Sequence, residues 1–62
     1  MNGIEITENE KLIILRKRKN ISQLEVAKKL MVSQAYISMF ENGKEIMRED
    51  LLEKYKQYII TV

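Results

Sequence analysis

Three hydroxyl residues, each placed where a helix can begin, divide this sequence into short helical segments. The first two are each followed three residues later by a glutamate, in the pairs Thr7–Glu10 and Ser22–Glu25, and the third is Ser33. In such a capping box the hydroxyl accepts a hydrogen bond from a backbone amide of the first turn, and the glutamate accepts one from the amide of the capping residue. The sequence contains no proline to interrupt a helix. The pattern therefore predicts three short helices, over residues 8–19, 23–30 and 34–41.

The helix ends and a fourth helix can also be placed. Asn20 and the pair Asn42–Gly43 follow the first and third helices, and both residue types accept the left-handed conformation at a helix end. A fourth helix is predicted over residues 48–58, because apolar and aromatic residues recur there at helical spacing. These residues are Leu51, Leu52, Tyr55, Tyr58 and Ile59.

The helical pattern predicts an all-α fold with one domain over residues 1–62. A chain of 62 residues buries only about 60% of the surface that its unfolded form exposes, so its core is small. The predicted core lies on the inner helix faces and in the second turn: Leu12, Leu15, Val26, Ala27, Leu30, Val32, Ile37, Phe40, Leu51, Leu52 and Tyr55. Two β-branched segments, residues 4–7 and 59–62, are also compatible with a short terminal ribbon, although tails of this length are as often frayed.

The residue types that are absent exclude several classes of function. Cysteine and histidine are both missing, which removes disulfides, thiolate metal ligands and the commonest general base. A chain this short also builds a closed cleft with difficulty, so no enzyme, metal site or bound cofactor is expected. No apolar run approaches the roughly 20 residues that span a bilayer, so no membrane association is expected. The absence of cysteine suits the reducing cytoplasm.

Positive charge is concentrated in the middle of the sequence. The formal net charge is +2, but residues 11–44 carry eight basic groups against only two acidic groups, Glu25 and Glu41. The basic groups are Lys11, Arg16, Lys17, Arg18, Lys19, Lys28, Lys29 and Lys44. Such a segment fits a polyanionic partner. Taken alone, it is more often an ordinary solvated lysine surface.

Only about three residues, 31–33, separate the second and third helices, and this spacing is typical of a helix-turn-helix. Ala27 supplies a small residue where the two helices cross, and Val32 supplies an apolar residue in the turn. The gapless stretch over residues 15–44 resembles the Cro and repressor family of phage and bacterial regulators. The matching positions are Leu15, Arg16, Ile21, Ser22, Gln23, Val26, Ala27, Leu30, Val32, Ser33, Ile37, Ser38, Glu41, Gly43 and Lys44.

The resemblance implies sequence-specific binding of duplex DNA by a small transcriptional regulator. It gives Arg16 and Glu41 the positions of a partly buried ion pair between the first and third helices. The third helix becomes the recognition helix in the major groove, and its implied base-reading residues are Ser33, Gln34, Ala35, Ser38 and Met39. The implied contacts to the DNA backbone are Gln23, Tyr36, Asn42 and Lys44. A symmetric homodimer on two half-sites is the usual arrangement for this motif, although the sequence leaves monomer and dimer open.

Four residues depart from the family pattern. Met31 occupies the turn position usually filled by glycine, although a non-glycine residue at positive φ costs about 1–2 kcal/mol. Ile13, Ile14 and Leu24 add apolar surface, which either packs against the fourth helix and the tails or faces a partner chain. This surplus keeps a second function open: a helix-turn-helix protein-interaction module that binds another regulator, as an antirepressor or an antitoxin-like partner does.

Overall fold

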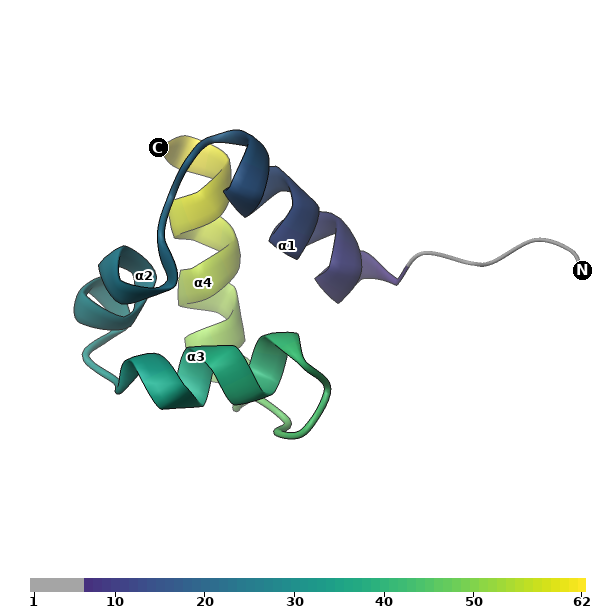
Figure 1. Cartoon of the computed structure of the whole chain (residues 1–62), viewed down its shortest axis with the longest axis vertical. Coiled ribbons are helices and arrows are strands. Elements are labelled where there is room, and N and C mark those ends of the chain that lie inside the picture. The colour runs from purple at the N-terminus through teal and green to yellow at the C-terminus, as the bar shows by residue number, and fades with distance from the viewer. Residues whose placement is uncertain (1–6) are drawn as a thin grey trace, which may run out of the picture.

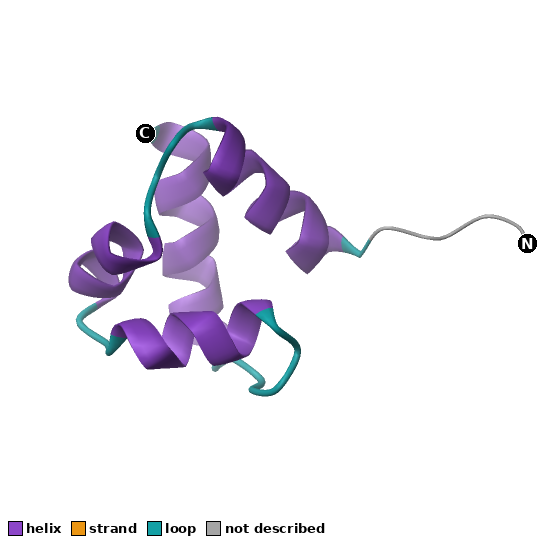
Figure 2. Ribbon diagram, viewed as in Figure 1, coloured by secondary structure: helices purple, strands orange, loops and turns teal. Residues whose placement is uncertain are grey.

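The computed structural model describes residues 7–62 and shows four helices joined by short loops (Figure 1). The helices are α1 (Glu8–Arg18), α2 (Gln23–Leu30), α3 (Gln34–Glu41) and α4 (Glu49–Thr61). α2 and α3 lie side by side as consecutive short helices, while α4 begins behind α3 and runs between α2 and α1 to the C-terminal end of α1 (Figure 1). No strand occurs within residues 7–62, so the predicted all-α fold is confirmed (Figure 2).

The first three helices begin at the hydroxyl residues that the sequence singles out, whereas α4 begins after Arg48 without a side-chain cap. Thr7 forms a complete capping box: its Oγ1 accepts from the Glu10 amide at 3.1 Å, and its own amide donates to the Glu10 carboxylate at 2.9 Å. Ser22 Oγ accepts from the Glu25 amide at 3.0 Å. The second half of that box was predicted wrongly, because the Glu25 carboxylate instead accepts a hydrogen bond from the hydroxyl of Tyr58. Glu25 therefore ties α2 to α4.

The ends of α1, α2 and α3 share one geometry. Each helix is followed by a residue with positive φ: Asn20 (59°), Met31 (61°) and Gly43 (75°). In each case the amide of the next residue donates back to a carbonyl five positions earlier, as Val32 does to Ala27 at 3.0 Å. This is the Schellman motif, which satisfies the last carbonyls of a helix and turns the chain sharply. Three such turns fold the short helices onto one another.

The end of α4 differs from the sequence-based expectation. The hypothesis of a ribbon strand at residues 59–62 is wrong, because α4 continues through Ile59 to Thr61; the other half, residues 4–6, lies outside the described residues. Lys19 explains part of this extension: its ammonium donates to the carbonyls of Ile59, Ile60 and Val62 at 2.8–3.0 Å. A cation at a helix C-terminus is also favoured by the helix dipole.

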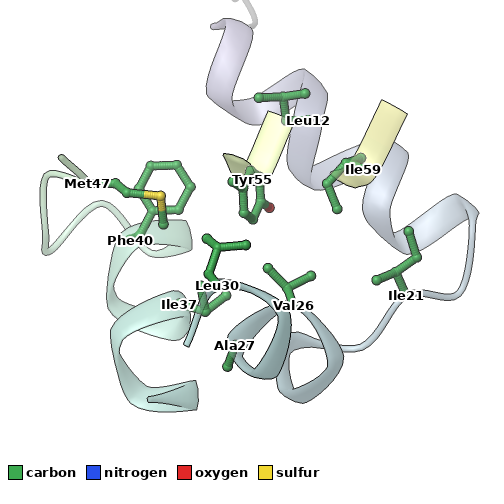
Figure 3. Close-up of a cluster of buried hydrophobic side chains, with 10 residues drawn as sticks. All are labelled: Leu12, Ile21, Val26, Ala27, Leu30, Ile37, Phe40, Met47, Tyr55 and Ile59. Carbon is green, nitrogen blue, oxygen red and sulfur yellow. The ribbon is translucent and has the colours of Figure 1, made fainter. Parts of the chain in front are cut away.

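The core gathers side chains from every helix and from two loops (Figure 3). Its buried members are Leu12, Ile21, Val26, Ala27, Leu30, Ile37, Phe40, Met47, Tyr55 and Ile59. Four residues predicted as core are only half-buried and pack around this cluster: Leu15, Val32, Leu51 and Leu52. Phe40 and Tyr55 meet edge to face, with ring centroids 5.4 Å apart, and this contact joins α3 to α4.

Candidate nucleic-acid interface

The α2–turn–α3 unit places one face of α3 on the core and leaves the other in solvent. Ile37 and Phe40 are buried, while Gln34 and Ala35 are exposed at the beginning of the helix. Ser33 caps the helix, since its Oγ accepts from the Tyr36 amide at 3.1 Å. α3 is therefore held in a fixed orientation with its N-terminal turn accessible to a ligand.

The five residues implied as base-reading contacts lie together on or beside this open face. Gln34 and Ala35 are exposed, and Ser38 one turn later is half-buried. The Met39 side chain is 42% exposed, and Ser33 is exposed at the helix start. The geometry thus gathers these residues around the N-terminal half of α3, which is the part that enters a major groove in helix-turn-helix proteins.

The four residues implied as contacts to the DNA backbone lie around the ends of α2 and α3. They differ in how far their side chains are exposed or held by hydrogen bonds. Lys44 is exposed just beyond α3, and Asn42 donates from Nδ2 to Ser38 Oγ at 3.4 Å. Tyr36 is half-buried and packs against the core. Gln23, the first residue of α2, is also half-buried, and its Nε2 donates to Glu41 Oε1 at 3.1 Å. Of these four, Lys44 is thus open to solvent, whereas Gln23 is half-buried and held by a hydrogen bond to Glu41.

Arg16 and Glu41 form a two-point ion pair inside the domain. Arg16 Nε and Nη2 each donate to one carboxylate oxygen of Glu41 at 2.7 Å, and the two side chains are only 7% and 5% exposed. The remaining guanidinium nitrogen donates to the carbonyl of Ile21 at 2.6 Å. The structure therefore brings together the two residues that the resemblance pairs. Their ion pair joins α1 to the end of α3.

The environment of Glu41 keeps its carboxylate charged. Burial alone raises the pKa of Glu41, but hydrogen bonds from Arg16, Gln23 and Tyr55 outweigh that effect and hold it below its ordinary value. Burial and the bond to Glu41 raise the pKa of the Tyr55 hydroxyl. Within residues 7–62, no buried side-chain nitrogen or oxygen lacks a hydrogen-bond partner. Each side-chain nitrogen of Arg16 and each carboxylate oxygen of Glu41 thus has a hydrogen-bond partner within the protein.

The sequence does not predict that Tyr55 or Gln23 bonds to Glu41, and Tyr55 was expected only as a core residue. Its ring lies in the core, as its place on the apolar stripe of α4 predicts, but its hydroxyl donates to Glu41 Oε2 at 2.8 Å. A tyrosine rather than phenylalanine at a core position is the signal that a buried polar partner exists. The identity of that partner depends on the tertiary fold.

Several groups of the basic central segment have roles inside the protein. Arg16 is paired with Glu41, Lys19 binds the carbonyls at the end of α4, and the Lys29 ammonium lies 5.7 Å from the centre of the Tyr58 ring. Every basic group of this segment except Arg16 is exposed, and five of them have no such contact within the described residues: Lys11, Lys17, Arg18, Lys28 and Lys44. Among these basic groups, only the charge of Arg16 is therefore buried; Lys19 and Lys29 make contacts within the protein but stay exposed.

Residues 7–62 contain no cluster of three or more histidine, cysteine or acidic side chains that could hold a metal ion. An open groove of about 630 Å³ between Lys29 of α2 and the Tyr58 side of α4 includes no residue of α3, so it is separate from the candidate interface. Among the described helices, none is long and apolar enough to cross a membrane.

Comparison with known proteins places the chain in a family. A family model described as helix-turn-helix matches residues 12–57, which extend from α1 through most of α4. No curated protein and no solved structure gives a significant match. The matched span contains the complete α2–turn–α3 unit together with the Arg16–Glu41 pair. The chain belongs to the XRE family of helix-turn-helix proteins, which are DNA-binding regulators.

Proposed function

We propose that this protein binds duplex DNA sequence-specifically as a small phage or bacterial transcriptional regulator, with α3 in the major groove. The proposal rests on one observation: one side of α3 is buried in the core and the opposite side is exposed to solvent. Ile37 and Phe40 anchor one side in the core, whereas Gln34 and Ala35 stand in solvent at the N-terminal turn. A reading helix needs this combination, because base recognition requires side chains held in a fixed direction.

The chemistry of the exposed face favours an A·T-containing target. Gln34 carries a side-chain amide that can bond adenine N6 and N7 together, and Ala35 offers a methyl group to the methyl of thymine. Ser33, Ser38 and Met39 complete the face, which contains no arginine or lysine for the common two-point grip on guanine. Recognition at this operator would therefore depend on adenine and thymine more than on guanine.

The groups around α3 would hold the sugar-phosphate backbone. Gln23 at the start of α2 and Tyr36 at the groove edge would contact one side, and Asn42 and Lys44 beyond α3 would contact the other. A pair of such domains, related by two-fold symmetry on two half-sites, is the arrangement we favour. The protein would then act in the cytoplasm on a pseudo-palindromic operator.

A second function has one specific observation in its favour. Leu24 and Met31, seven residues apart at the two ends of α2, are 47% and 90% exposed, and Ile14 of α1 is 41% exposed. Exposed apolar side chains of this kind are common at protein interfaces. A helix-turn-helix module that binds another regulator, as an antirepressor or antitoxin-like protein does, would use such residues instead of the α3 face.

The first experiment is selection of bound duplexes from a random pool, followed by two matched substitutions. Gln34→Ala removes a base-reading group and should cost about 1–3 kcal/mol at one base pair while relaxing the preference there. Lys44→Ala removes a phosphate contact, so it should weaken binding to all sequences alike and reduce the salt slope by about one. Affinities are measured for the selected site, single-base variants and random duplex at several salt concentrations.

The two substitutions should affect DNA binding differently: Gln34→Ala changes the base preference, whereas Lys44→Ala weakens binding to every sequence. The comparison therefore separates base-reading contacts from phosphate contacts. If Gln34→Ala weakens all duplexes equally, α3 does not read bases as proposed. If purified protein shows no salt-dependent DNA binding at low ionic strength, the DNA function fails and the protein-interaction function takes its place.

A further inference from the structure

The Gln23 side chain links the candidate DNA surface to the buried ion pair. Its Nε2 donates to Glu41 Oε1 at 3.1 Å, and the same oxygen accepts from Arg16 Nη2 at 2.7 Å. Gln23 is the first residue of α2 and Glu41 is the last residue of α3, so this contact joins the start of one helix to the end of the other. Gln23 is half-buried, whereas Gln34 on the reading face is exposed.

The hydrogen bond to Glu41 restricts the remaining donor of Gln23. A carboxamide nitrogen carries two hydrogens in the plane of the group, and a phosphate oxygen can only accept. When one hydrogen is bonded to Glu41, the amide plane is fixed and the direction of the second hydrogen is fixed with it. A long polar side chain normally loses rotamer freedom when it binds a ligand. Gln23 has already lost that freedom in the unbound protein.

We propose that Glu41 is a positioning residue for DNA binding, which holds the Gln23 amide so that its second hydrogen points at a backbone phosphate. The inference rests on the proposed DNA function and deepens it. Glu41 itself touches no DNA, since its side chain is 5% exposed and is occupied by Arg16, Gln23 and Tyr55. The same carboxylate thus joins the helices and prepares a DNA contact.

A double-mutant cycle tests this coupling. Gln23→Met keeps the length of the side chain and removes its donor, and the expected loss of DNA affinity is about tenfold. The salt slope should not change, because glutamine carries no charge and releases no counterion. The second arm replaces the buried polar cluster by apolar groups in one variant, Arg16→Met/Glu41→Leu/Tyr55→Phe. This replacement leaves the net charge of the chain at +2, and apolar replacement of a buried ion pair often preserves folding.

The cycle has a clear expected result. The apolar replacement should lose about the same tenfold affinity as Gln23→Met, and Gln23→Met should then cost nothing further in that background. Tyr55→Phe alone is the matched control. Tyr55 bonds the other oxygen of Glu41, so this substitution should leave DNA affinity unchanged. A full tenfold effect of Gln23→Met in the apolar background would overturn the inference.

A measurement on the unaltered protein covers the case in which the replaced core fails to fold. Hydrogen exchange of the side-chain amides, followed by NMR, should show one Gln23 hydrogen exchanging more slowly than those of Gln34. Equal exchange at the two glutamines would show that Gln23 is not held, and the inference fails. Loss of all DNA binding by wild-type protein would instead refute the proposed function, whereas binding with an unaffected Gln23→Met variant refutes only the positioning role.

Discussion

At the scale of single residues, the Glu41 carboxylate holds the domain together. It lies at the end of α3 and accepts hydrogen bonds from Arg16 of α1, Gln23 of α2 and Tyr55 of α4. Each of the other three helices is therefore bonded directly to this group, α1 by two hydrogen bonds and α2 and α4 by one each. Removing one partner of a buried charge pair is costly, because the other charge remains buried without compensation.

Glu41→Ala is expected to destabilise the protein strongly. The Arg16 guanidinium would keep its bond to the Ile21 carbonyl but would lose both bonds to a carboxylate. The expected loss is about 3–5 kcal/mol, which is a large part of the total stability of a domain this small. Thermal and urea unfolding measure it, with Glu45→Ala at an exposed loop glutamate as the control. Equal melting of wild type and Glu41→Ala would show that the pair contributes nothing.

Acid should remove the same contribution. The pKa of Glu41 is lowered in the folded protein, so the unfolded chain takes up a proton near the ordinary value of 4.5 while the folded chain resists protonation. The stabilisation is therefore fully present above pH 4.5 and is lost as the pH falls through the lower folded pKa. The free energy of unfolding, measured with urea, should fall more steeply between pH 7 and pH 2.5 for wild type than for the Arg16→Met/Glu41→Leu/Tyr55→Phe variant. Parallel curves would contradict this.

The resemblance identifies the Arg16–Glu41 pair in advance, but it does not identify the groups around it. Gln23 was predicted as a phosphate contact, and its bond to Glu41 depends on how α2 crosses α3. Tyr55 was predicted as a core ring, and its hydroxyl finds Glu41 only after α4 has docked. Contacts between residues far apart in the sequence carry no local pattern, so single-sequence reasoning cannot place them.

At the scale of elements, the turn between α2 and α3 carries local strain. Met31 has φ 61° and ψ 43°, although its side chain is 90% exposed and gains little from packing. Gly43 occupies the corresponding position after α3 and has φ 75°. Left-handed backbone is unfavourable for residues with a Cβ atom, so the α2–α3 turn forms at a cost that the rest of the fold offsets.

Met31→Gly is therefore expected to stabilise the protein. The relief of the left-handed conformation exceeds the greater freedom of glycine in the unfolded chain, and the net gain should be about 0.5–1 kcal/mol. Met31→Ala is the matched control, because it removes the same exposed side chain but keeps the Cβ atom. Unfolding in urea separates the two. A gain with alanine equal to that with glycine would attribute the effect to the lost side chain and not to the backbone.

Helix positions follow closely from the caps and the apolar spacing, and the exceptions have physical causes. α2 and α3 occupy the predicted residues because Ser22 and Ser33 start them and a left-handed residue ends each one. The C-terminal end of α4 was misjudged, since β-branched residues also suit a strand. Ile59 is buried against the core and Lys19 binds the last carbonyls, and these tertiary contacts favour the helix.

At the scale of the whole molecule, loop residues complete the core. Ile21 between α1 and α2 is 3% exposed, and Met47 between α3 and α4 is 4% exposed. Neither was predicted, because helical periodicity says nothing about loops. Ile21 anchors the loop that precedes α2, and Met47 anchors the loop that follows α3. The domain thus presents one well-supported surface, and the central claim is that this surface binds duplex DNA.

The most direct test of that claim is the affinity of the wild-type protein for duplex DNA as salt is varied. We predict that the logarithm of the binding constant falls linearly with the logarithm of salt concentration, by about 0.9 for each phosphate neutralised. The selected site should be bound at least about 1,000-fold more tightly than random duplex at the same salt. Absence of binding at low ionic strength, or equal affinity for selected and random duplexes, would contradict the account.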